Sequence, residues 1–310
     1  MIYHLFQLLK DYDIPGQGLM SYLSFRAMLA SVTAMLISFF AGRRIIRWLQ
    51  KKQIGETIRD LGLEGQMQKK GTPTMGGVII ILAITVPVLL FCDLTNIYTQ
   101  LLLLTTLWCG GIGFADDYIK VFKHNKEGMS ERGKLILQIL LGLIVGLTVC
   151  FNNDIVVREK VNVAEASNGT TYLPQGSSDL DVDSETIVSS SGWKMENIVK
   201  STKTTIPFVK NHEFDYKWLS PFQGAWGWYC KWAIYVLMIV IVITACSNGT
   251  NLTDGMDGLA AGSSAIVGIV IGIIAWLSGN LINSNYLNIM YIPGSGEVAV
   301  FMSIFVGALF

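Results

Sequence analysis

An acidic pair, Asp116 and Asp117, ends an apolar run of the chain, and Lys120 follows it. On a helix, residues three and four positions apart share a face, so this lysine can reach either carboxylate. Adjacent carboxylates at a membrane boundary repel each other unless a cation or a hydrogen-bond donor compensates them. The pair therefore indicates a site for a metal ion or a phosphate group, although a simple ion pair at the end of a helix would show the same spacing.

A second polar cluster lies much further along the chain, between two apolar segments. Asn251, Asp254 and Asp257 recur every three residues, and Gly255 and Gly258 stand beside the two acids. If the segment is helical, this spacing gives one polar wall opposite an apolar wall. The alternative is a glycine-rich loop with Asx-turns, which does not need a helical spacing of the acids.

A third segment, residues 69–77, reads Lys-Lys-Gly-Thr-Pro-Thr-Met-Gly-Gly and leads into another apolar run. Backbone N–H groups at the start of a helix bind anions, and the lysines add positive charge. We therefore predict a phosphate or nucleotide contact here. The alternative is a basic loop that only sets topology; this describes residues 43–52 well but explains the threonines and glycines of 69–77 less well.

The elements that must position these residues are membrane helices. Of the 310 residues, 51% are hydrophobic and 15% are charged, and the mean hydropathy is +0.47, which excludes an ordinary soluble domain. Crossing about 30 Å of hydrocarbon takes roughly 20 apolar residues. Because a seventh apolar run reaches the last residue before it is long enough to cross, we expect the natural protein to continue. The candidate spans are 22–42, 76–92, 97–119, 135–152, 230–247, 259–278 and the run from Glu297 to Phe310.

Charge bias predicts how these spans are oriented. Lys and Arg crowd residues 43–70, between the first two spans, and residues 120–134, between the third and fourth. Loops rich in Lys and Arg face the cytoplasm. Counting spans from there places the N-terminus and residues 153–229 outside, and both acidic clusters at the cytoplasmic face. The clusters are therefore predicted to form one site.

Three regions follow from this count. Residues 1–152 hold the first four spans with their basic and Asp-Asp loops, 153–229 form a polar periplasmic insertion, and 230–310 hold the later spans with the Asn251–Gly258 loop. Alternating apolar residues within 154–163 predict a short strand or hairpin. The five cysteines lack metal-like spacing, and we find no Walker A loop, no Ser-His-Asp arrangement and no nucleic-acid signature.

Together, these motifs resemble those of the bacterial phospho-N-acetylmuramoyl-pentapeptide transferases, within the wider polyprenyl-phosphate N-acetylhexosamine-1-phosphate transferase family. The resemblance rests on residues 69–77, 113–120, 130–134 and 251–259, and it spans the chain except for 153–229. It implies an all-α polytopic protein of the bacterial inner membrane, with both termini outside. About ten transmembrane helices are expected in the family and about seven in this chain.

The resemblance also implies a reaction and its participants. Phospho-N-acetylmuramoyl-pentapeptide passes from its UDP carrier to undecaprenyl phosphate, which gives lipid I and UMP, the first membrane step of peptidoglycan synthesis. Magnesium (Mg2+) is the implied cofactor, the lipid bilayer and a homodimer are the implied surroundings, and no nucleic acid takes part. The residues carried over are Asp116, Asp117, Asp254 and Lys120 as catalytic; Lys69, Thr74, Lys134, Asn251, Gly255 and Asp257 as substrate-binding; and Asp117 as the metal ligand, with a further aspartate beyond Phe310.

On this reading, an oxygen of the lipid phosphate attacks the β-phosphorus of the donor in line, and Lys120 or Lys134 holds the anionic oxygens. Asp116 would position or deprotonate the incoming phosphate. A covalent phosphosugar intermediate on an aspartate is the rival scheme. Two further functions stay open: a sister transferase specific for N-acetylglucosamine-1-phosphate, and a transporter or lipid-binding protein, which would place its acids near the middle of the helices.

Overall fold

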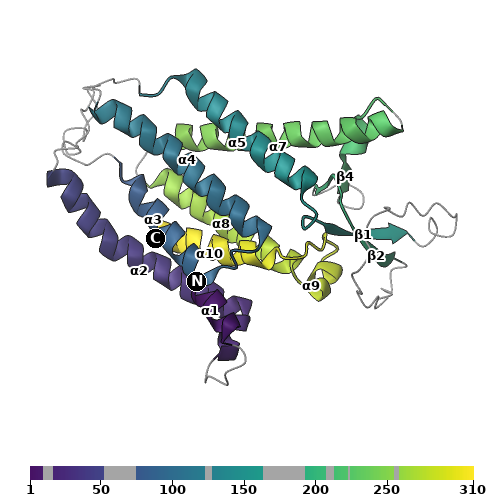
Figure 1. The fold of residues 1–310 in the computed structure, drawn as a ribbon, viewed down its shortest axis with the longest axis horizontal. Helices are drawn as coiled ribbons and strands as arrows, with labels where there is room; N and C mark the ends of the chain where they lie inside the picture. The colour runs from purple at the N-terminus through teal and green to yellow at the C-terminus, as the bar shows by residue number, and fades with distance from the viewer. Residues whose placement is uncertain are drawn as a thin grey trace.

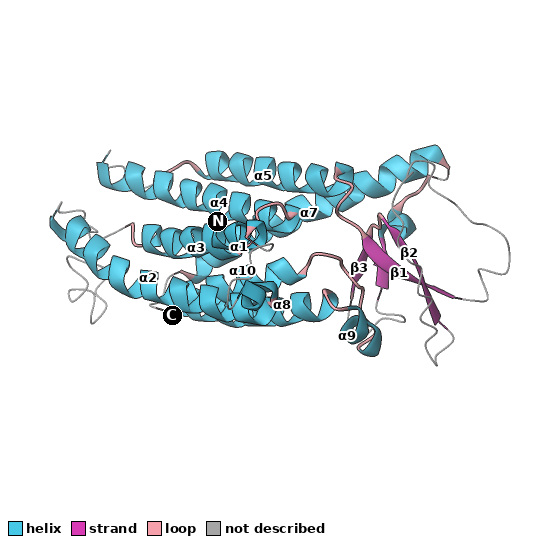
Figure 2. Cartoon of the chain, turned by 60° about the horizontal axis from the view of Figure 1, so that its bottom comes forward, coloured by secondary structure: helices cyan, strands magenta, loops and turns pink. Residues whose placement is uncertain are grey.

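The computed structural model describes residues 1–9, 17–51, 75–122, 128–162, 193–206, 213–222, 224–254 and 258–310. Its long helices lie side by side in an elongated bundle, and the strands lie beyond one end of that bundle (Figures 1 and 2). The bundle helices are α2 (Leu23–Lys51), α3 (Gly77–Phe91), α4 (Ile97–Phe122), α5 (Glu131–Phe151), α7 (Ala225–Thr253), α8 (Leu259–Ser278) and α10 (Gly296–Leu309).

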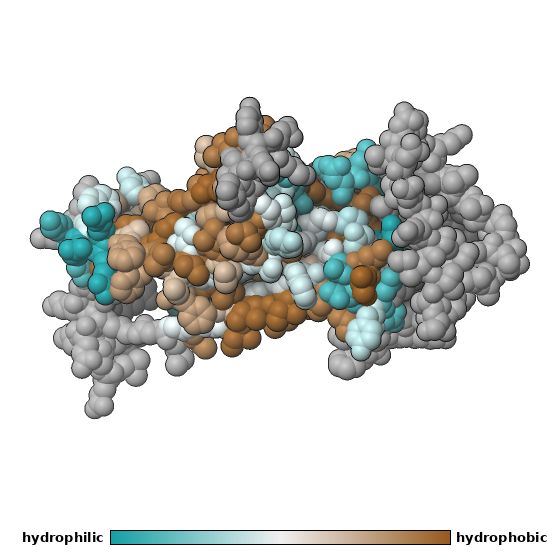
Figure 3. All heavy atoms as spheres, turned by 90° about the horizontal axis from the view of Figure 1, so that it is seen from below, coloured by the Kyte–Doolittle hydropathy of each residue, from teal (hydrophilic) through white to brown (hydrophobic). Residues whose placement is uncertain are grey.

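The predicted apolar spans are all helices, and five of them are long and apolar enough to cross a membrane: α2, α4, α5, α7 and α8. Two others, α3 and α10, are apolar but shorter. With 15 residues, α3 extends over only about 22 Å. A band of apolar surface runs between polar ends of the molecule (Figure 3). The prediction of a helical, multi-pass membrane protein is therefore confirmed at this level.

The main core lies where α2, α3 and α10 meet. Small side chains there let the helices approach closely, as is common in membrane bundles. A Cβ atom added to Gly307 of α10 would lie 2.4 Å from the backbone oxygen of Ser31 in α2. Pro87 lies within α3 and is buried, and the helix continues through it. The buried residues of this core include Ala30, Ala34, Ala83, Ile84, Val88, Val300 and Ile304.

A second close contact joins α5 to α7. A Cβ atom on Gly142 would lie 2.8 Å from Cα of Val240, and one on Gly146 would lie 2.9 Å from Cγ1 of Val236. Moving four residues toward the C-terminus of α5, from Gly142 to Gly146, corresponds to moving four residues toward the N-terminus of α7, from Val240 to Val236. The two helices are antiparallel, and this register fixes which of their turns lie at the same level.

Short elements occupy the chain between α5 and α7. The strand β1 (Val157–Asn162) pairs antiparallel with β2 (Trp193–Val199), and β3 (Lys203–Thr205) pairs with β4 (Glu213–Asp215). The strand predicted within 154–163 is confirmed, but its partner is a distant segment. The all-α prediction is incomplete, because two small sheets stand outside the helical bundle. Within the described residues, the remaining short helices are α1 (Ile2–Leu8), η1 (Gln17–Ser21), η4 (Tyr216–Leu219) and α9 (Leu281–Tyr286).

Candidate active site

Asp116 is the centre of a charged cluster in the last two turns of α4. One of its oxygens, Oδ2, lies 2.7 Å from Nζ of Lys120, and the other, Oδ1, lies 2.9 Å from Nζ of Lys134. The carboxylate itself is buried, whereas Lys120 is exposed and Lys134 is half-buried. Two ammonium groups from two helices therefore meet on one buried carboxylate, and the side chain of Lys120 is 43% exposed.

The residues just before α5, from Gly128 on, are shaped around this carboxylate. The backbone N–H of Met129 donates a hydrogen bond to Oδ1 of Asp116 at 2.8 Å. Gly128 has a φ of +71°, and a Cβ atom there would lie 2.4 Å from the same oxygen, so only glycine fits. Ser130 then caps α5 by accepting a hydrogen bond from the N–H of Gly133 at 3.3 Å. The helix start places Lys134 in its first turns.

The sequence predicted that Lys120 reaches the acidic pair, and the structure places it on Asp116, four residues earlier. Asp117 is half-buried on the same helix, one residue further on. The contact of Lys134 with Asp116 was not predicted from the sequence, nor was the role of Gly128. A serine followed by a glutamate, as at 130–131, is a typical helix start. A helix beginning there would have placed Lys134 in its first turns, and the short connection would have placed those turns beside the end of α4.

The second polar cluster is only partly helical. Asn251 lies in the last turn of α7, and Asp254 follows that helix as its C-cap. Gly258, with a φ of +78°, precedes α8. The predicted helical wall is thus present at Asn251, and helix α7 ends before Asp254; its continuation to Asp257 lies outside the described residues. The predicted contacts Gly255, Asp257, Lys69 and Thr74 lie outside the described residues.

The register of α5 and α7 brings the two clusters to the same end of the bundle. Gly142 lies opposite Val240, so two turns nearer the start of α5, Lys134 is level with residues near 248 on α7. Asn251 and Asp254 follow on α7 and at its C-cap, within two turns of residue 248. The acids thus lie near helix ends and not near the middle of the helices, which counts against the transporter alternative.

Mg2+ is compatible with this arrangement. Among the described residues, no three His, Cys, Asp or Glu side chains come together as a metal site. Magnesium, however, usually binds through one or two carboxylates together with substrate phosphates and water. Both oxygens of Asp116 already accept hydrogen bonds from lysines. Asp117, the predicted ligand, is half-buried on the same helix, and its role in binding Mg2+ stays a prediction.

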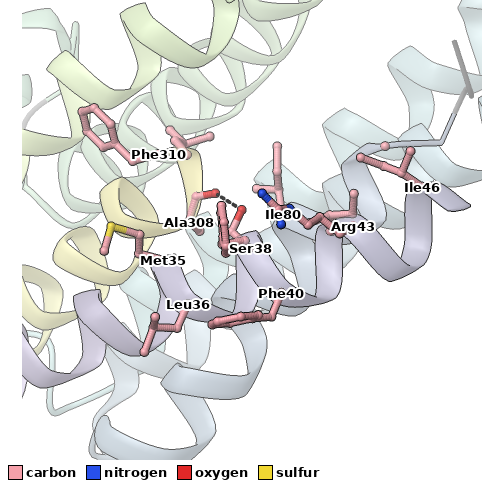
Figure 4. Close-up of a pocket in the computed structure, with 14 residues that line it drawn as sticks. Met35, Leu36, Ser38, Phe40, Arg43, Ile46, Ile80, Ala308 and Phe310 are labelled. Atoms are coloured by element: carbon pink, nitrogen blue, oxygen red, sulfur yellow. Dashed lines mark hydrogen bonds between the residues drawn. The ribbon is translucent and has the colours of Figure 1, made fainter.

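A separate cavity of about 680 Å³ lies between α2, α3 and α10. Its lining is mostly apolar, with Arg43 as the charged member, and Ser38 donates a hydrogen bond to the carbonyl of Ala308 at 3.2 Å within it (Figure 4). None of the predicted site residues lines this cavity. We therefore place the candidate active site at the Asp116 cluster.

Apolar helices with a charged cluster at one end define a multi-pass membrane protein with a site at the end of its bundle. Residues 195–310 match the model of glycosyl transferase family 4, and residues 69–81 match signature 1 of the phospho-N-acetylmuramoyl-pentapeptide-transferases. Proteins named phospho-N-acetylmuramoyl-pentapeptide-transferase are similar to this chain over nearly its whole length. That of Parabacteroides distasonis is 49% identical over 99% of this chain and 69% of its own length, and that of Flavobacterium psychrophilum is 50% identical over 100% and 72%. The chain belongs to the phospho-N-acetylmuramoyl-pentapeptide-transferase family.

Proposed function

We propose that this protein transfers phospho-N-acetylmuramoyl-pentapeptide from its UDP carrier to undecaprenyl phosphate, producing lipid I and UMP. The observation that carries the proposal is the pair of lysines held on Asp116 at the end of the bundle. A soluble diphosphate donor and a lipid phosphate can meet at such a place. The names of the relatives and the matched signature supply the donor sugar.

The proposal includes the setting of the reaction. The protein would lie in the bacterial inner membrane, with the N-terminus outside and the Asp116 cluster at the cytoplasmic face, as the basic connections predict. Membrane-embedded acids are costly and tend to mark functional sites, which supports placing the chemistry here.

In the reaction, an oxygen of the lipid phosphate forms a bond to the β-phosphorus of the donor. The bond from that phosphorus to the bridging oxygen breaks, and UMP leaves with this oxygen. A phosphate monoester has a second pKa near 6, so the lipid phosphate is largely a dianion at neutral pH and needs no strong base. Lys120 and Lys134 would stabilise the charge on the phosphate oxygens.

Asp116 would then position the two lysines. Three donors, the two ammonium groups and the N–H of Met129, already occupy its oxygens, which favours positioning over proton abstraction. Mg2+, when bound, would neutralise negative charge on the diphosphate. Asp117 would hold it, and Asn251 and Asp254 would contact the donor from the end of α7.

The test is release of UMP by the purified protein in the presence of undecaprenyl phosphate and Mg2+. Two donors are compared, UDP-N-acetylmuramoyl-pentapeptide and UDP-N-acetylglucosamine, and Asp117→Asn and chelation of Mg2+ serve as controls. We expect release from the muramoyl donor alone, lost in both controls. Release from the glucosamine donor alone would assign the sister activity, and UMP release without the lipid acceptor would support the covalent scheme.

A further inference from the structure

A pair of amide side chains joins α5 to α7, one of them buried and the other, Asn248, exposed. Gln138 of α5 is buried, and its Nε2 donates hydrogen bonds to Oγ of Ser247 at 3.0 Å and to Oδ1 of Asn248 at 3.4 Å. In return, Nδ2 of Asn248 donates to Oε1 of Gln138 at 3.0 Å. A buried amide such as that of Gln138 is costly unless it is hydrogen-bonded, so its reciprocal pairing with Asn248 favours one alignment of the two helices.

This pair lies next to the candidate active site. Gln138 is one helical turn beyond Lys134 on α5, and Asn248 is three residues before Asn251 on α7. Through Lys134, α5 contacts Asp116 of α4, and the carbonyl of Leu137 accepts a hydrogen bond from Nε1 of Trp108 in α4 at 3.1 Å. Helix α5 is therefore fixed to α4 on one side and to α7 on the other, within two turns.

The glycine contacts between α5 and α7 do not fix this alignment by themselves. Gly142 and Gly146 pack on Val240 and Val236, and they set how close the helices come. Apolar contacts of this kind tolerate small axial shifts, whereas one buried polar residue can specify register, as in coiled coils. A shift of 1 Å at the reacting groups can cost about 100-fold in rate.

We propose that Gln138 is a positioning residue, which through Asn248 fixes the axial register of α7 against α5. It would thereby hold Asn251 and Asp254 at a set separation from Lys134 and Asp116. This inference rests on the proposed function. A donor bound by the end of α7 would still bind after a shift of register, but its phosphorus would be misplaced relative to the lysines.

The experiment exchanges the two amides. Gln138→Asn shortens the span between the helices by one methylene, and the double variant Gln138→Asn/Asn248→Gln restores the total length. UMP release and the thermal unfolding midpoint are measured for the full chain. We expect kcat to fall at least about tenfold in Gln138→Asn with the KM for the donor changed less than about threefold, and to recover at least partly in the double variant. Thr148→Val is the control on α5, because within the described residues the hydroxyl of Thr148 donates a hydrogen bond only to the carbonyl of Ile144 in its own helix.

Three results separate the possible failures. If the unchanged protein releases no UMP, the proposed function fails, whatever Gln138 does. If it is active and Gln138→Asn retains its kcat, the positioning role is overturned. If the double variant is no more active than Gln138→Asn, the amide pair is structural and the inference fails. The inference also fails if Gln138→Asn lowers kcat and the unfolding midpoint in the same proportion as Thr148→Val does.

Discussion

Two ion-pair clusters occupy opposite ends of the helical bundle, and they differ in burial. Arg26 of α2 and Glu297 of α10 lie 2.5 Å apart, with side chains only 5% and 10% exposed. They sit beside Asp93, just before α4 begins, whereas Asp116 lies near the end of α4. In the Asp116 cluster, the side chains of Lys120 and Lys134 are 43% and 25% exposed. The same charges are thus enclosed at one end and accessible at the other.

The partners of the enclosed pair explain the difference. Nη1 of Arg26 donates to the carbonyl of Phe91 at 3.4 Å, and its guanidinium lies 4.3 Å from the ring centre of Tyr3. Glu297 accepts a hydrogen bond from the N–H of Asp93 at 3.0 Å. These contacts connect α2, the end of α3 and α10 to one another, which suits a structural role. The Asp116 cluster instead leaves its ammonium groups accessible for a ligand.

The largest effect is expected from breaking the enclosed pair. Glu297→Ala leaves the buried guanidinium of Arg26 without its carboxylate, and such a loss costs about 3–5 kcal/mol of stability. The thermal unfolding midpoint and the yield of folded protein in detergent should both fall sharply. The double variant Arg26→Met/Glu297→Leu should regain most of the loss, because well-packed apolar residues can replace a buried pair. Equal instability in both variants would contradict a role of the charges themselves.

The next largest effect is expected at the accessible cluster, on rate. Asp116→Asn removes the charge that holds Lys120 and Lys134, and UMP release should fall by about 100-fold with little change in the unfolding midpoint. Because a positioning role for Asp116 involves no proton transfer, the loss should be constant from about pH 6.5 to about pH 9. A loss that shrinks as the pH rises would instead assign proton abstraction to Asp116. Asp93→Asn, the same change at the opposite end, should leave the rate unchanged.

The sequence predicts contacts between residues that are close along the chain better than contacts between residues that are far apart. The positions of the helices follow from the apolar runs, although α2 continues to Lys51 and α7 to Thr253, beyond the predicted spans 22–42 and 230–247. The contact of Lys120 with Asp116 follows from helical spacing. The contact of Lys134 with Asp116 depends on the path of the turn at Gly128, which spacing does not give. Arg26 lies within an expected span, where an ionisable residue signals a partner, but nothing local in the sequence points to Glu297.

A smaller effect is expected from the turn at Gly128. Gly128→Ala forces an L-residue into a φ of +71° and places its Cβ against Oδ1 of Asp116. Such strain costs about 1–3 kcal/mol, and a displaced carboxylate should lower kcat by about tenfold. Gly111→Ala on α4 is the matched control, since a Cβ atom there meets nothing within 4 Å. If both variants behave alike, Asp116 does not depend on this turn.

The smallest effect is expected far from both clusters. In the β1 to β2 register, Asn162 lies opposite Trp193, so an Asn-Gly turn can replace residues 163–192. On the proposed topology, this segment lies across the membrane from the reaction, and turnover should change by less than about twofold. The measurement is UMP release by the shortened, folded protein. A selective loss of turnover would show that the segment acts on the site.

The sequence separation of the Arg26–Glu297 pair also has a consequence for biogenesis. The two residues are 271 positions apart, so at about 5–20 residues per second, tens of seconds pass between their syntheses. During that interval the first long helix is in the membrane with a cation whose counter-ion has not been made. Arg26 is close to the start of α2, where its side chain can reach the headgroups and stay hydrated until α10 arrives.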